Sequence, residues 1–471
     1  MKTPILLRLV AITMAFGLLF SCSEREEITD SSNDNQAVLK SKTVESGPVF
    51  FVTPTGYDDT DNIETALSDA AEAGPGSTVK FSEGIFYFSR GLKTTCFDGY
   101  INGAGKGKTL ITMTPGEKID GEPIEGWGGM MFSYLLYFHG GNIQMSDLSF
   151  VITDNEPAGE QYSNDWWQNA LYCLIVIDGE PYTSVSSSFD NIGFTGSPGN
   201  FFGYNIAHAF HIFGNPYLDG GSHSLTNCDF KNMFVTYNGF CHKNSSFLIG
   251  GSPQDGNKFE NTGYGPFLED VSNSAIEISY NDIIETATAG SVIYQGSIVS
   301  PLSLELSKVL IHNNHYKIID ECDAIWIVDY GHYTGNPKMN ISVYNNIMEL
   351  ETAEWYGGIW ITSVSGAIIT NNIISGNGYY GIYSNYGSGL FIKGNNLQNL
   401  NAQLAPILLS PATSNSMVIG GSNLTNVLDY GTDNILTGVN NMEADPIGPV
   451  VYDAMMYKKE LLKTFKDLFK E

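Results

Sequence analysis

The stretch Ile368–Ser384, "IITNNIISGNGYYGIYS", places a pair of asparagines, Asn371 and Asn372, between two β-rich segments. Aliphatic and aromatic residues flank the pair, and no helical spacing of apolar residues runs through it. The stretch therefore predicts two short strands joined by a tight polar bend. Similar segments recur along the chain as "ISYNDII" at 278, "IHNNHYKI" at 311, "VYNNIME" at 343, "IKGNNLQN" at 392 and "IGGSNLTN" at 419, with weaker copies "MSDLSF" at 145, "SFDNIGF" at 188 and "TNCDF" at 226.

The recurring bends indicate a solenoid whose coils differ in length. Stacked coils would bring the bend side chains within about 4.8 Å of one another, so that each amide bonds to the next coil. Asparagine also tolerates the left-handed backbone conformation that such bends require. The second polar residue of each bend lies at intervals of 24 to 32 residues, at Asp282, Asn314, Asn346, Asn372, Asn396 and Asn423.

This pattern resembles the right-handed parallel β-helix of the pectate-lyase-like superfamily, which carries an asparagine ladder. The resemblance covers residues 46–450 and implies one all-β domain. Near the N-terminal end of this domain, the sequence predicts a helix. Asp61 and Glu64 have the spacing of a capping box, and apolar residues repeat at helical spacing from Ile63 to Ala70. A Gly-Pro-Gly sequence at 74–76 would end the helix. We expect this helix to cover the N-terminal end of the solenoid, and residues 451–471 to form a C-terminal amphipathic helix.

The first 45 residues have the features of an export and anchoring segment. Residues 1–22 combine basic residues with a short apolar run and end in Leu19–Cys22, which resembles the lipobox of bacterial lipoproteins. The resemblance implies cleavage before Cys22 and its lipidation. The acidic residues that follow resemble the surface-export tag of Bacteroidetes lipoproteins, and residues 23–45 have the composition of a flexible tether. We therefore expect an outer-membrane lipoprotein, exposed at the cell surface and held to the membrane by lipid.

Charge narrows the choice of partners. The formal net charge is -28, and the chain contains three arginines, at positions 8, 25 and 90. A protein that binds nucleic acid or another polyanion would normally present a basic patch, so these partners are disfavoured. A neutral or weakly charged polysaccharide fits the composition better. No feature of the sequence requires a partner chain, and we expect a monomer.

Aromatic residues follow each bend at a similar distance. If Ile293, Ile325, Ile359 and Ile382 point into the solenoid, strand alternation sends the next residue of each strand outward. The resulting exposed row could stabilise the coils by ring stacking, or it could form a platform for sugar rings. The four aromatic residues of the row are Tyr294, Trp326, Trp360 and Tyr383.

Candidate catalytic groups lie near this row. A glycosidase needs two carboxyl groups, and Glu269, Asp323 and Asp329 are the available acids. The sequence "DECDAIWI" at 320 resembles the acidic strand of polygalacturonase-type hydrolases. A polysaccharide lyase is the second choice; by the resemblance it would use lysine or His332 as the base, and such an enzyme could recruit Ca²⁺. A non-catalytic glycan-binding or structural protein is the third.

Two histidine pairs have a spacing of three residues. On a regular strand this spacing points the two rings to opposite faces, so neither pair is expected to bind a metal. We expect no metal site and no cofactor for a hydrolase. The pairs are His208 with His211 and His312 with His315.

Overall fold

The computed structural model describes residues 47–115, 122–123, 131–152, 171–179, 184–196, 207–214, 220–240, 242–295, 307–319, 322–329, 339–352, 355–420 and 425–442. The chain divides into residues 1–44 and residues 45–471, and all described residues belong to the second unit. The expected signal peptide with Cys22, the tether, His332, Asn423 and the C-terminal helix lie outside the described residues.

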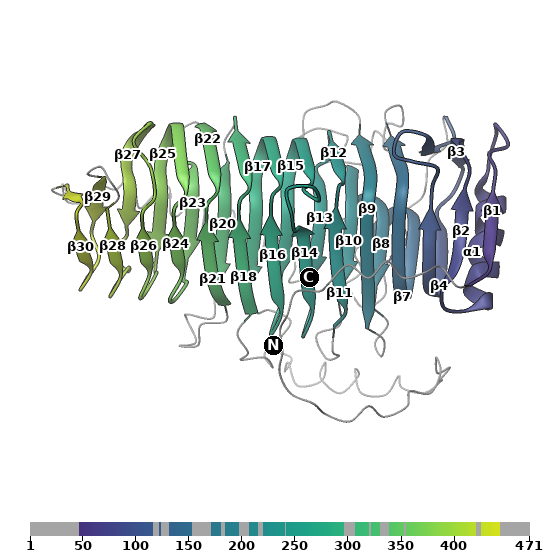
Figure 1. Ribbon diagram of the computed structural model, residues 1–471, viewed down its shortest axis with the longest axis horizontal. Helices are drawn as coiled ribbons and strands as arrows, with labels where there is room; N and C mark the ends of the chain where they lie inside the picture. The colour runs from purple at the N-terminus through teal and green to yellow at the C-terminus, as the bar shows by residue number, and fades with distance from the viewer. Residues whose placement is uncertain are drawn as a thin grey trace, which may run out of the picture. The chain divides into compact units, whose positions relative to one another are not determined.

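Strands of successive coils pair in parallel and form a right-handed parallel β-helix with three sheets (Figure 1). Among the described strands, the pairing of β6 with β7 is the antiparallel exception. Six long strands turn a corner and contribute to more than one sheet: β4 (Leu92–Asn102), β7 (Met131–Ile152), β9 (Val185–Gly196), β15 (Lys258–Glu269), β17 (Asp282–Gln295) and β25 (Ile373–Asn385). The strand β27 (Leu400–Leu409) does the same near the end.

The remaining strands belong to one sheet each. The first sheet also contains β1 (Val49–Val52), β2 (Ser77–Phe81), β11 (Ser222–Thr226), β14 (Ser246–Gly250), β16 (Ala275–Ser279), β18 (Ser307–His312), β21 (Met339–Tyr344), β24 (Ile368–Thr370), β26 (Phe391–Lys393), β28 (Met417–Ile419) and β30 (Ile435–Thr437). The second also contains β3 (Gly84–Phe88), β5 (Thr109–Met113), β12 (Asp229–Lys231), β19 (His315–Ile318) and β22 (Ile347–Glu351). The third also contains β8 (Leu171–Asp178), β10 (Ala207–Phe213), β13 (Val235–Phe240), β20 (Asp323–Asp329), β23 (Gly357–Thr362), β29 (Asn426–Asp429) and β31 (Asn440–Asn441), and β6 (Glu122–Pro123) pairs with β7 beside it.

Alternation along the strands sends apolar side chains into the solenoid, where like residues of successive coils stack. In the second sheet, four phenylalanines lie in register with nearly parallel rings, and their neighbouring centroids are 4.9 to 5.3 Å apart. Stacking at the strand spacing packs the interior densely and links each coil to the next. The four residues are Phe150, Phe194, Phe230 and Phe259.

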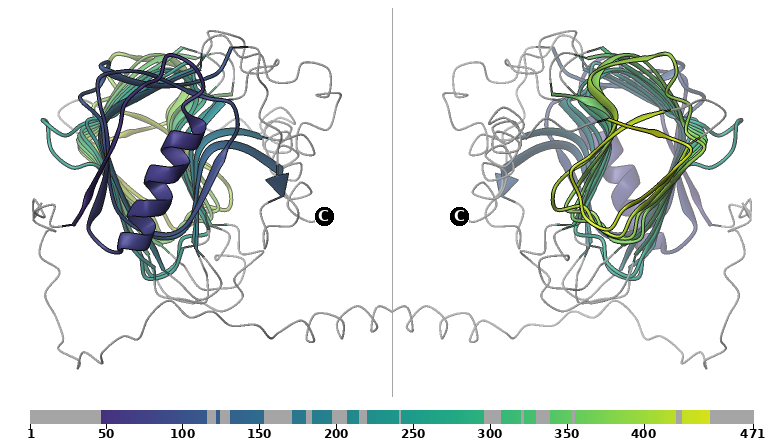
Figure 2. Two further views of the ribbon diagram at one scale, coloured as in Figure 1. Left: turned by 90° about the vertical axis from the view of Figure 1, so that its right-hand side faces the viewer. Right: turned by 90° about the vertical axis from the view of Figure 1, so that its left-hand side faces the viewer.

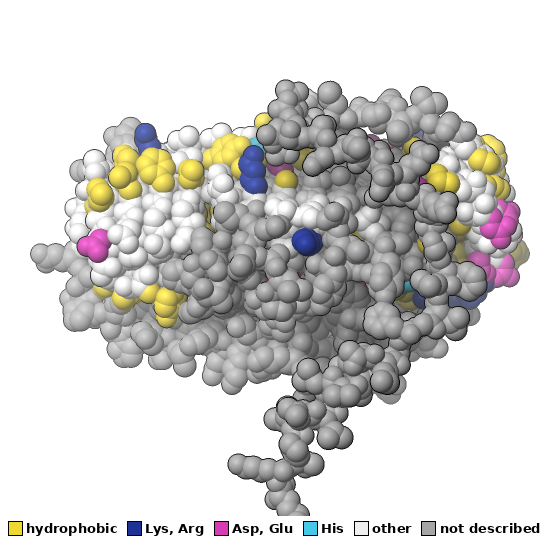
Figure 3. Space-filling view, turned by 90° about the horizontal axis from the view of Figure 1, so that it is seen from below, with side chains coloured by type: hydrophobic (Ala, Val, Ile, Leu, Met, Phe, Trp, Pro, Cys, Tyr) yellow, Lys and Arg dark blue, Asp and Glu magenta, His cyan; other side chains and the backbone are white. Residues whose placement is uncertain are grey.

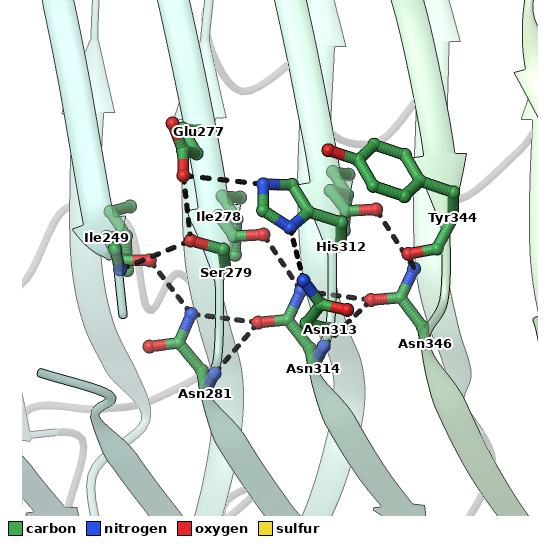
Figure 4. A network of polar contacts seen from close by, with 12 residues as sticks. Ile249, Glu277, Ile278, Ser279, Asn281, His312, Asn313, Asn314, Tyr344 and Asn346 are labelled. Atoms are coloured by element: carbon green, nitrogen blue, oxygen red, sulfur yellow. Dashed lines mark hydrogen bonds and ion pairs between the residues drawn. The ribbon is translucent and has the colours of Figure 1, made fainter. Parts of the chain in front are cut away.

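The asparagine ladder is confirmed at the corner between the first and second sheets (Figure 4). Asn314 shows the pattern: its Nδ2 donates to the carbonyl of Ile278 at 2.8 Å and to Asn346 Oδ1 at 3.0 Å. Its own Oδ1 accepts from the backbone and side chain of Asn281. Each amide thus uses both donors and both lone pairs inside the wall. The ladder runs through Asn257, Asn281, Asn314, Asn346, Asn372 and Asn395.

Two members of the predicted ladder are wrong by one residue. Asn281 takes the ladder position, whereas Asp282 begins β17 and bonds His315 on the outer surface. Asn395 takes the ladder position after Asn372, and Asn396 is exposed. In both bends the left-handed residue comes directly before the ladder residue, at Tyr280 and Gly394. In these two bends the ladder amide is therefore the one that follows the left-handed residue.

The N-terminal helix is confirmed, and it lies across the end of the solenoid (Figure 2). This helix, α1 (Thr60–Ala73), buries Ile63, Ala66, Leu67 and Ala70, the predicted apolar face. The predicted capping role of Asp61 is wrong, because the helix begins earlier and Asp59 is its N-cap residue. The Asp59 carboxylate instead accepts from the backbone of Thr55 and Tyr87, and Asp61 and Glu64 pair with Arg90.

The outer faces of the first two sheets are partly exposed. Strands such as β22 alternate between buried and exposed residues, as expected for a sheet with one face in solvent. Apolar side chains form rows along the long axis at the end of the solenoid far from α1 (Figure 3). Ile368 and Ile435, on the outer face of the first sheet, are 41% and 55% exposed.

Candidate functional site

The third sheet differs from the other two because its strands are buried on both faces. All six residues of β23 are buried, and β20 has a single partly exposed residue, Trp326. The outward side chains form an apolar cluster of their own, separate from the solenoid core, which includes Tyr264, Tyr294, Trp360 and Tyr383. This outer face of the third sheet, called the site face below, is the candidate functional surface.

Each strand of the site face turns two successive residues inward. In β20 both Ala324 and Ile325 belong to the core, while Asp323 and Trp326 on either side face outward. Several other strands place glycine at the first of the two positions, where successive backbones approach closely: a β-carbon at Gly265 would collide with the carbonyl oxygen of Gly290. Residues three apart therefore share the outer face, which a regular strand does not allow.

This local geometry overturns the expectation for one histidine pair. His208 and His211 lie on the same face of β10 with stacked rings, and Nδ1 of His208 is 2.6 Å from Nε2 of His211. Burial lowers the pKa of His211 to about 3, and burial with the neighbouring His211 lowers the pKa of His208 well below its usual value. Both rings are therefore neutral at physiological pH. The buried Nε2 of His208 has no hydrogen-bond partner among the described residues.

The aromatic row is confirmed for three of its four members. Trp326 pairs with Trp360, and Trp360 with Tyr383, on adjacent strands. The two indoles are stacked with centroids 5.2 Å apart and planes inclined by 4°. The placement of Tyr294 is wrong, because it pairs with Val328 and lies one row away.

The expectation that the row is exposed is also wrong. Trp360 is 4% exposed, Tyr383 and Tyr294 are equally buried, and Trp326 alone is partly exposed. These rings still lie outside the solenoid wall, since Ile325, Ile359 and Ile382 fill the core behind them. The aromatic row is thus mostly buried on the outer face of the third sheet. In the described structure it does not form an open platform for sugar rings.

Asp323 begins the strand that carries Trp326. Its Oδ1 accepts hydrogen bonds from the Tyr380 hydroxyl at 2.6 Å and from the backbone N–H of Gly357 at 2.9 Å. Burial and the adjacent carboxylate raise the pKa of Tyr380 well above its usual value, so the phenol keeps its proton. Two donors on one oxygen fix the orientation of the carboxylate. This arrangement suits a positioning role better than proton transfer.

Glu269 has the environment of an acid catalyst. It is buried on the site face, and burial, followed by the charge of Asp270, raises its pKa well above the ordinary value. The side chain therefore keeps its proton to higher pH than an exposed glutamate and can donate it. Sequence alone could name Glu269 as a candidate but could not supply the burial that distinguishes it from other acids.

The acids are not all close together. Asp323 and Asp329 are separated by six residues of β20, up to about 20 Å of extended chain, beyond the roughly 5 to 9.5 Å of a glycosidase pair. Glu269 is in register with Tyr294 and Val328. Asp329, which follows Val328 and is buried, therefore lies about two strand spacings from Glu269, or about 10 Å between backbones. Among the predicted acids within the described structure, Glu269 and Asp329 are thus the pair whose backbones lie closest together.

A second group of polar side chains occupies the N-terminal part of the site face, and sequence reasoning missed it. The Tyr137 hydroxyl donates to Asp178 Oδ2 at 3.0 Å, and His139 Nδ1 lies 3.5 Å from the same oxygen. Lys93 Nζ lies 4.8 Å from the centre of the Tyr137 ring. The signal was present as polar residues within apolar strands, in "YLLYFHG" at 134 and "LIVIDG" at 174, but the preceding bends are too weak to place these strands on one face.

No membrane-spanning helix and no metal site emerge from the described residues. None of the described helices has the length and apolar character needed to cross a bilayer. Likewise, no three described His, Cys, Asp or Glu side chains converge to hold a metal ion.

Comparison with known proteins gives similarities of structure. No family model matches the sequence, and no curated protein matches it. The chain is similar to the A-module of the mannuronan C-5 epimerase AlgE6 of Azotobacter vinelandii, with a TM-score of 0.44, 13% identity and coverage of 85% of this chain and 98% of that one. It is also similar to the DFA-IIIase of Arthrobacter chlorophenolicus A6 without its lid, with a TM-score of 0.46, 10% identity and coverage of 83% of this chain and 100% of that one. A third similar structure is the periplasmic alginate epimerase AlgG, with a TM-score of 0.39, 12% identity and coverage of 83% of this chain and 84% of that one. This likeness concerns the β-helix alone, which the register of the strands already shows.

Proposed function

We propose that this protein is a carbohydrate-active enzyme that hydrolyses a neutral or weakly charged polysaccharide on the site face. The observation that carries the proposal is that one face combines a buried carboxyl group with a raised pKa, Glu269, with stacked aromatic rings, Trp326 and Trp360. Aromatic faces bind the apolar C–H surfaces of sugar rings, and a neutral carboxylic acid can protonate a glycosidic oxygen.

In this proposal, Glu269 donates its proton to the leaving oxygen and Asp329 activates a water molecule. A separation somewhat below 10 Å between the two carboxyl groups would fit an inverting mechanism, which needs about 6.5 to 9.5 Å. Asp323, held by Tyr380 and Gly357, is a fixed carboxylate at the start of β20 and has a positioning role. The roles of Glu269 and Asp329 rest on placement and burial, and a single substitution tests each of them.

Charge supports a substrate without many carboxylates. Arg90 pairs with Asp61 and Glu64 at α1, away from the site face, and the other two arginines precede residue 47. The site face instead carries Asp178, Glu269 and Asp323 in buried positions. A polyuronate would meet the carboxylates of Asp178 and Asp323 there, offset in part by Lys93 beside Tyr137.

Elimination is the second candidate, favoured by His208. Its buried Nε2 has no partner among the described residues, and a neutral imidazole can accept a proton from carbon next to a carboxylate. Tyr137, bonded to Asp178, lies on the same face as a potential acid. A strongly lowered pKa makes His208 a weak base, which is why hydrolysis is preferred.

The deciding experiment is a polysaccharide screen with the protein lacking residues 1–45. Hydrolysis yields new reducing ends alone, whereas elimination also yields an unsaturated product that absorbs near about 235 nm. Glu269→Gln and Asp329→Asn should each lower hydrolysis by at least about 100-fold, while His208→Gln leaves it nearly unchanged. A loss confined to His208→Gln, with absorbance in the wild type, would replace hydrolysis by elimination, and Ca²⁺ dependence would then be measured.

We also propose that the protein is a lipoprotein on the outer surface of the outer membrane, anchored at Cys22 and acting as a monomer. The lipobox-like sequence and the acidic residues after it support this proposal. Cys22→Ala should abolish acyl labelling and release the protein from membranes. Unchanged membrane fractionation and labelling of the variant would contradict the anchor.

A further inference from the structure

Four buried polar atoms without hydrogen-bond partners gather on three adjacent strands of the site face. They are Trp326 Nε1 in β20, Thr362 Oγ1 in β23, and Tyr383 Oη and Asn385 Oδ1 in β25, and none of them has a partner among the described residues. Thr362, Tyr383 and Asn385 are each less than 10% exposed. An unpaired buried polar group is costly, and native structures contain few of them.

The register of the strands brings these atoms together. Trp326 and Tyr383 pair with Trp360 from its two sides, and Thr362 pairs with Asn385 one row away. The residues between them point the other way: Ile327 and Ile361 belong to the solenoid core, and Ser384 bonds Thr413. All four groups therefore lie on the outer surface, within about two strand spacings of one another, roughly 10 Å.

The chemistry of the group is that of a sugar site. The indole N–H donates, the amide oxygen accepts, and the two hydroxyls do either, so together they complement the hydroxyl groups of a ligand. Beside them lies Trp326, the partly exposed member of the stacked indole pair, which adds apolar surface. The titratable neighbours include Asp323, which accepts hydrogen bonds from Tyr380 and Gly357, and Asp329, which directly follows the residue paired with Thr362.

We propose that these atoms form a binding subsite for one neutral sugar residue of the substrate chain. The inference rests on the proposed function and adds the position and the specificity of the subsite. Glu269 lies on β15, two strands before β20 and four before β25 in the stack. The subsite is thus about 10 to 19 Å from the acid along the solenoid axis. It holds the polysaccharide at a distance from the bond that is broken.

Conservative substitutions test the subsite because they remove the hydroxyls and keep the shape. Tyr383→Phe and Thr362→Val, singly and together, are compared with Thr370→Val, which lies on the outer face of the first sheet. The ligands are hexasaccharides of β-1,4-glucan, β-1,4-mannan and β-1,4-xylan, with hexagalacturonate as the charged comparison, and binding is followed by tryptophan fluorescence and calorimetry. We expect each site variant to weaken binding of the preferred neutral hexasaccharide by about threefold to tenfold. Thr370→Val should bind like the wild type, and the variants should unfold at or above the wild-type temperature without ligand.

Each other outcome overturns the subsite in a recognisable way. Wild-type affinity in the double variant, together with loss of turnover in Glu269→Gln, removes the subsite and leaves the proposed function intact. A lower unfolding temperature of the variants without ligand shows that the hydroxyls stabilise the fold. Equal or tighter binding of hexagalacturonate removes the neutral specificity. If the wild type neither binds nor cleaves any member of the panel or of the polysaccharide screen, the proposed function fails and the subsite fails with it.

Discussion

Asn372 donates from Nδ2 to Asn395 Oδ1 at 2.9 Å, and its backbone N–H donates to the same oxygen at 2.9 Å. The ladder therefore passes through Asn395 and misses its neighbour Asn396, which is exposed. Of these two adjacent asparagines, Asn395 links two coils and Asn396 does not belong to the ladder.

Replacing Asn395 by alanine should destabilise the fold far more than replacing Asn396. Asn395→Ala leaves two buried donors of Asn372 without an acceptor, at about 1 to 3 kcal/mol for each unpaired group. Asn396→Ala removes an exposed amide that accepts one bond from the backbone of Gln398. Urea unfolding of both variants measures the difference, and equal midpoints would contradict the ladder assignment.

The two tryptophans should contribute unequally to stability. Trp360 is almost fully buried, so Trp360→Ala should cost about 3 to 5 kcal/mol. Trp326 is partly exposed, and its replacement by alanine should cost about 1 to 2 kcal/mol. The free energy of unfolding of the single variants checks the order. A larger loss of unfolding free energy in Trp326→Ala than in Trp360→Ala would show that Trp326 is more deeply buried than described.

Glu269→Gln should stabilise the protein at alkaline pH while it abolishes turnover. The pKa of Glu269 is raised in the folded state, so the native protein keeps a proton that the unfolded chain loses above about pH 4.5. Stability from this group is present below that pH and is lost as the pH rises toward the folded pKa. The variant should match the wild type near pH 4 and exceed it at pH 8 in denaturant unfolding. A variant that is less stable than the wild type at pH 8 would remove the evidence for a buried neutral acid.

Two other histidines should make the fold sensitive to acid. His223 and His242 are buried with ring centroids 4.7 Å apart, and burial lowers the pKa of His242 to about 4. Between about pH 6.5 and pH 4 the unfolded chain binds a proton that native His242 does not, so the free energy of unfolding falls by about 1.4 kcal/mol per pH unit, or about 3 kcal/mol in all. His242→Gln should flatten this decline. Parallel pH profiles for variant and wild type would show that His242 does not titrate as described.

The solenoid could be predicted from the sequence because its strongest determinants are local. A polar pair within an aliphatic strand, as at Asn371 and Asn372, requires a bend whose amide is satisfied by the next coil. Which residue of the pair occupies the ladder depends on the left-handed residue before it, and "SYND" and "GNN" do not show by composition whether Tyr280 or Asn281, or Gly394 or Asn395, takes that conformation.

The candidate site could be predicted only in part, because simple alternation fails on the third sheet. The sequence placed Trp326, Trp360 and Tyr383 correctly, since all three follow an inward isoleucine. The prediction that His208 and His211 point to opposite faces was wrong, because Ala209 and Phe210 both turn inward in β10. A small residue before the inward apolar one, as in "AF", "AI" and "GI", was the available signal. Burial of Glu269 depends on the whole face and has no local signal.

The ladder also separates the evolution of the scaffold from that of its ligand surface. Successive ladder asparagines are 23 to 33 residues apart, yet their amide contacts stay between 2.8 and 3.0 Å. The same contact thus recurs between turns of different length, while the parallel pairing of the strands holds the rest of each turn. A lineage with this architecture can therefore vary the length of single turns while it keeps the ladder contact between them.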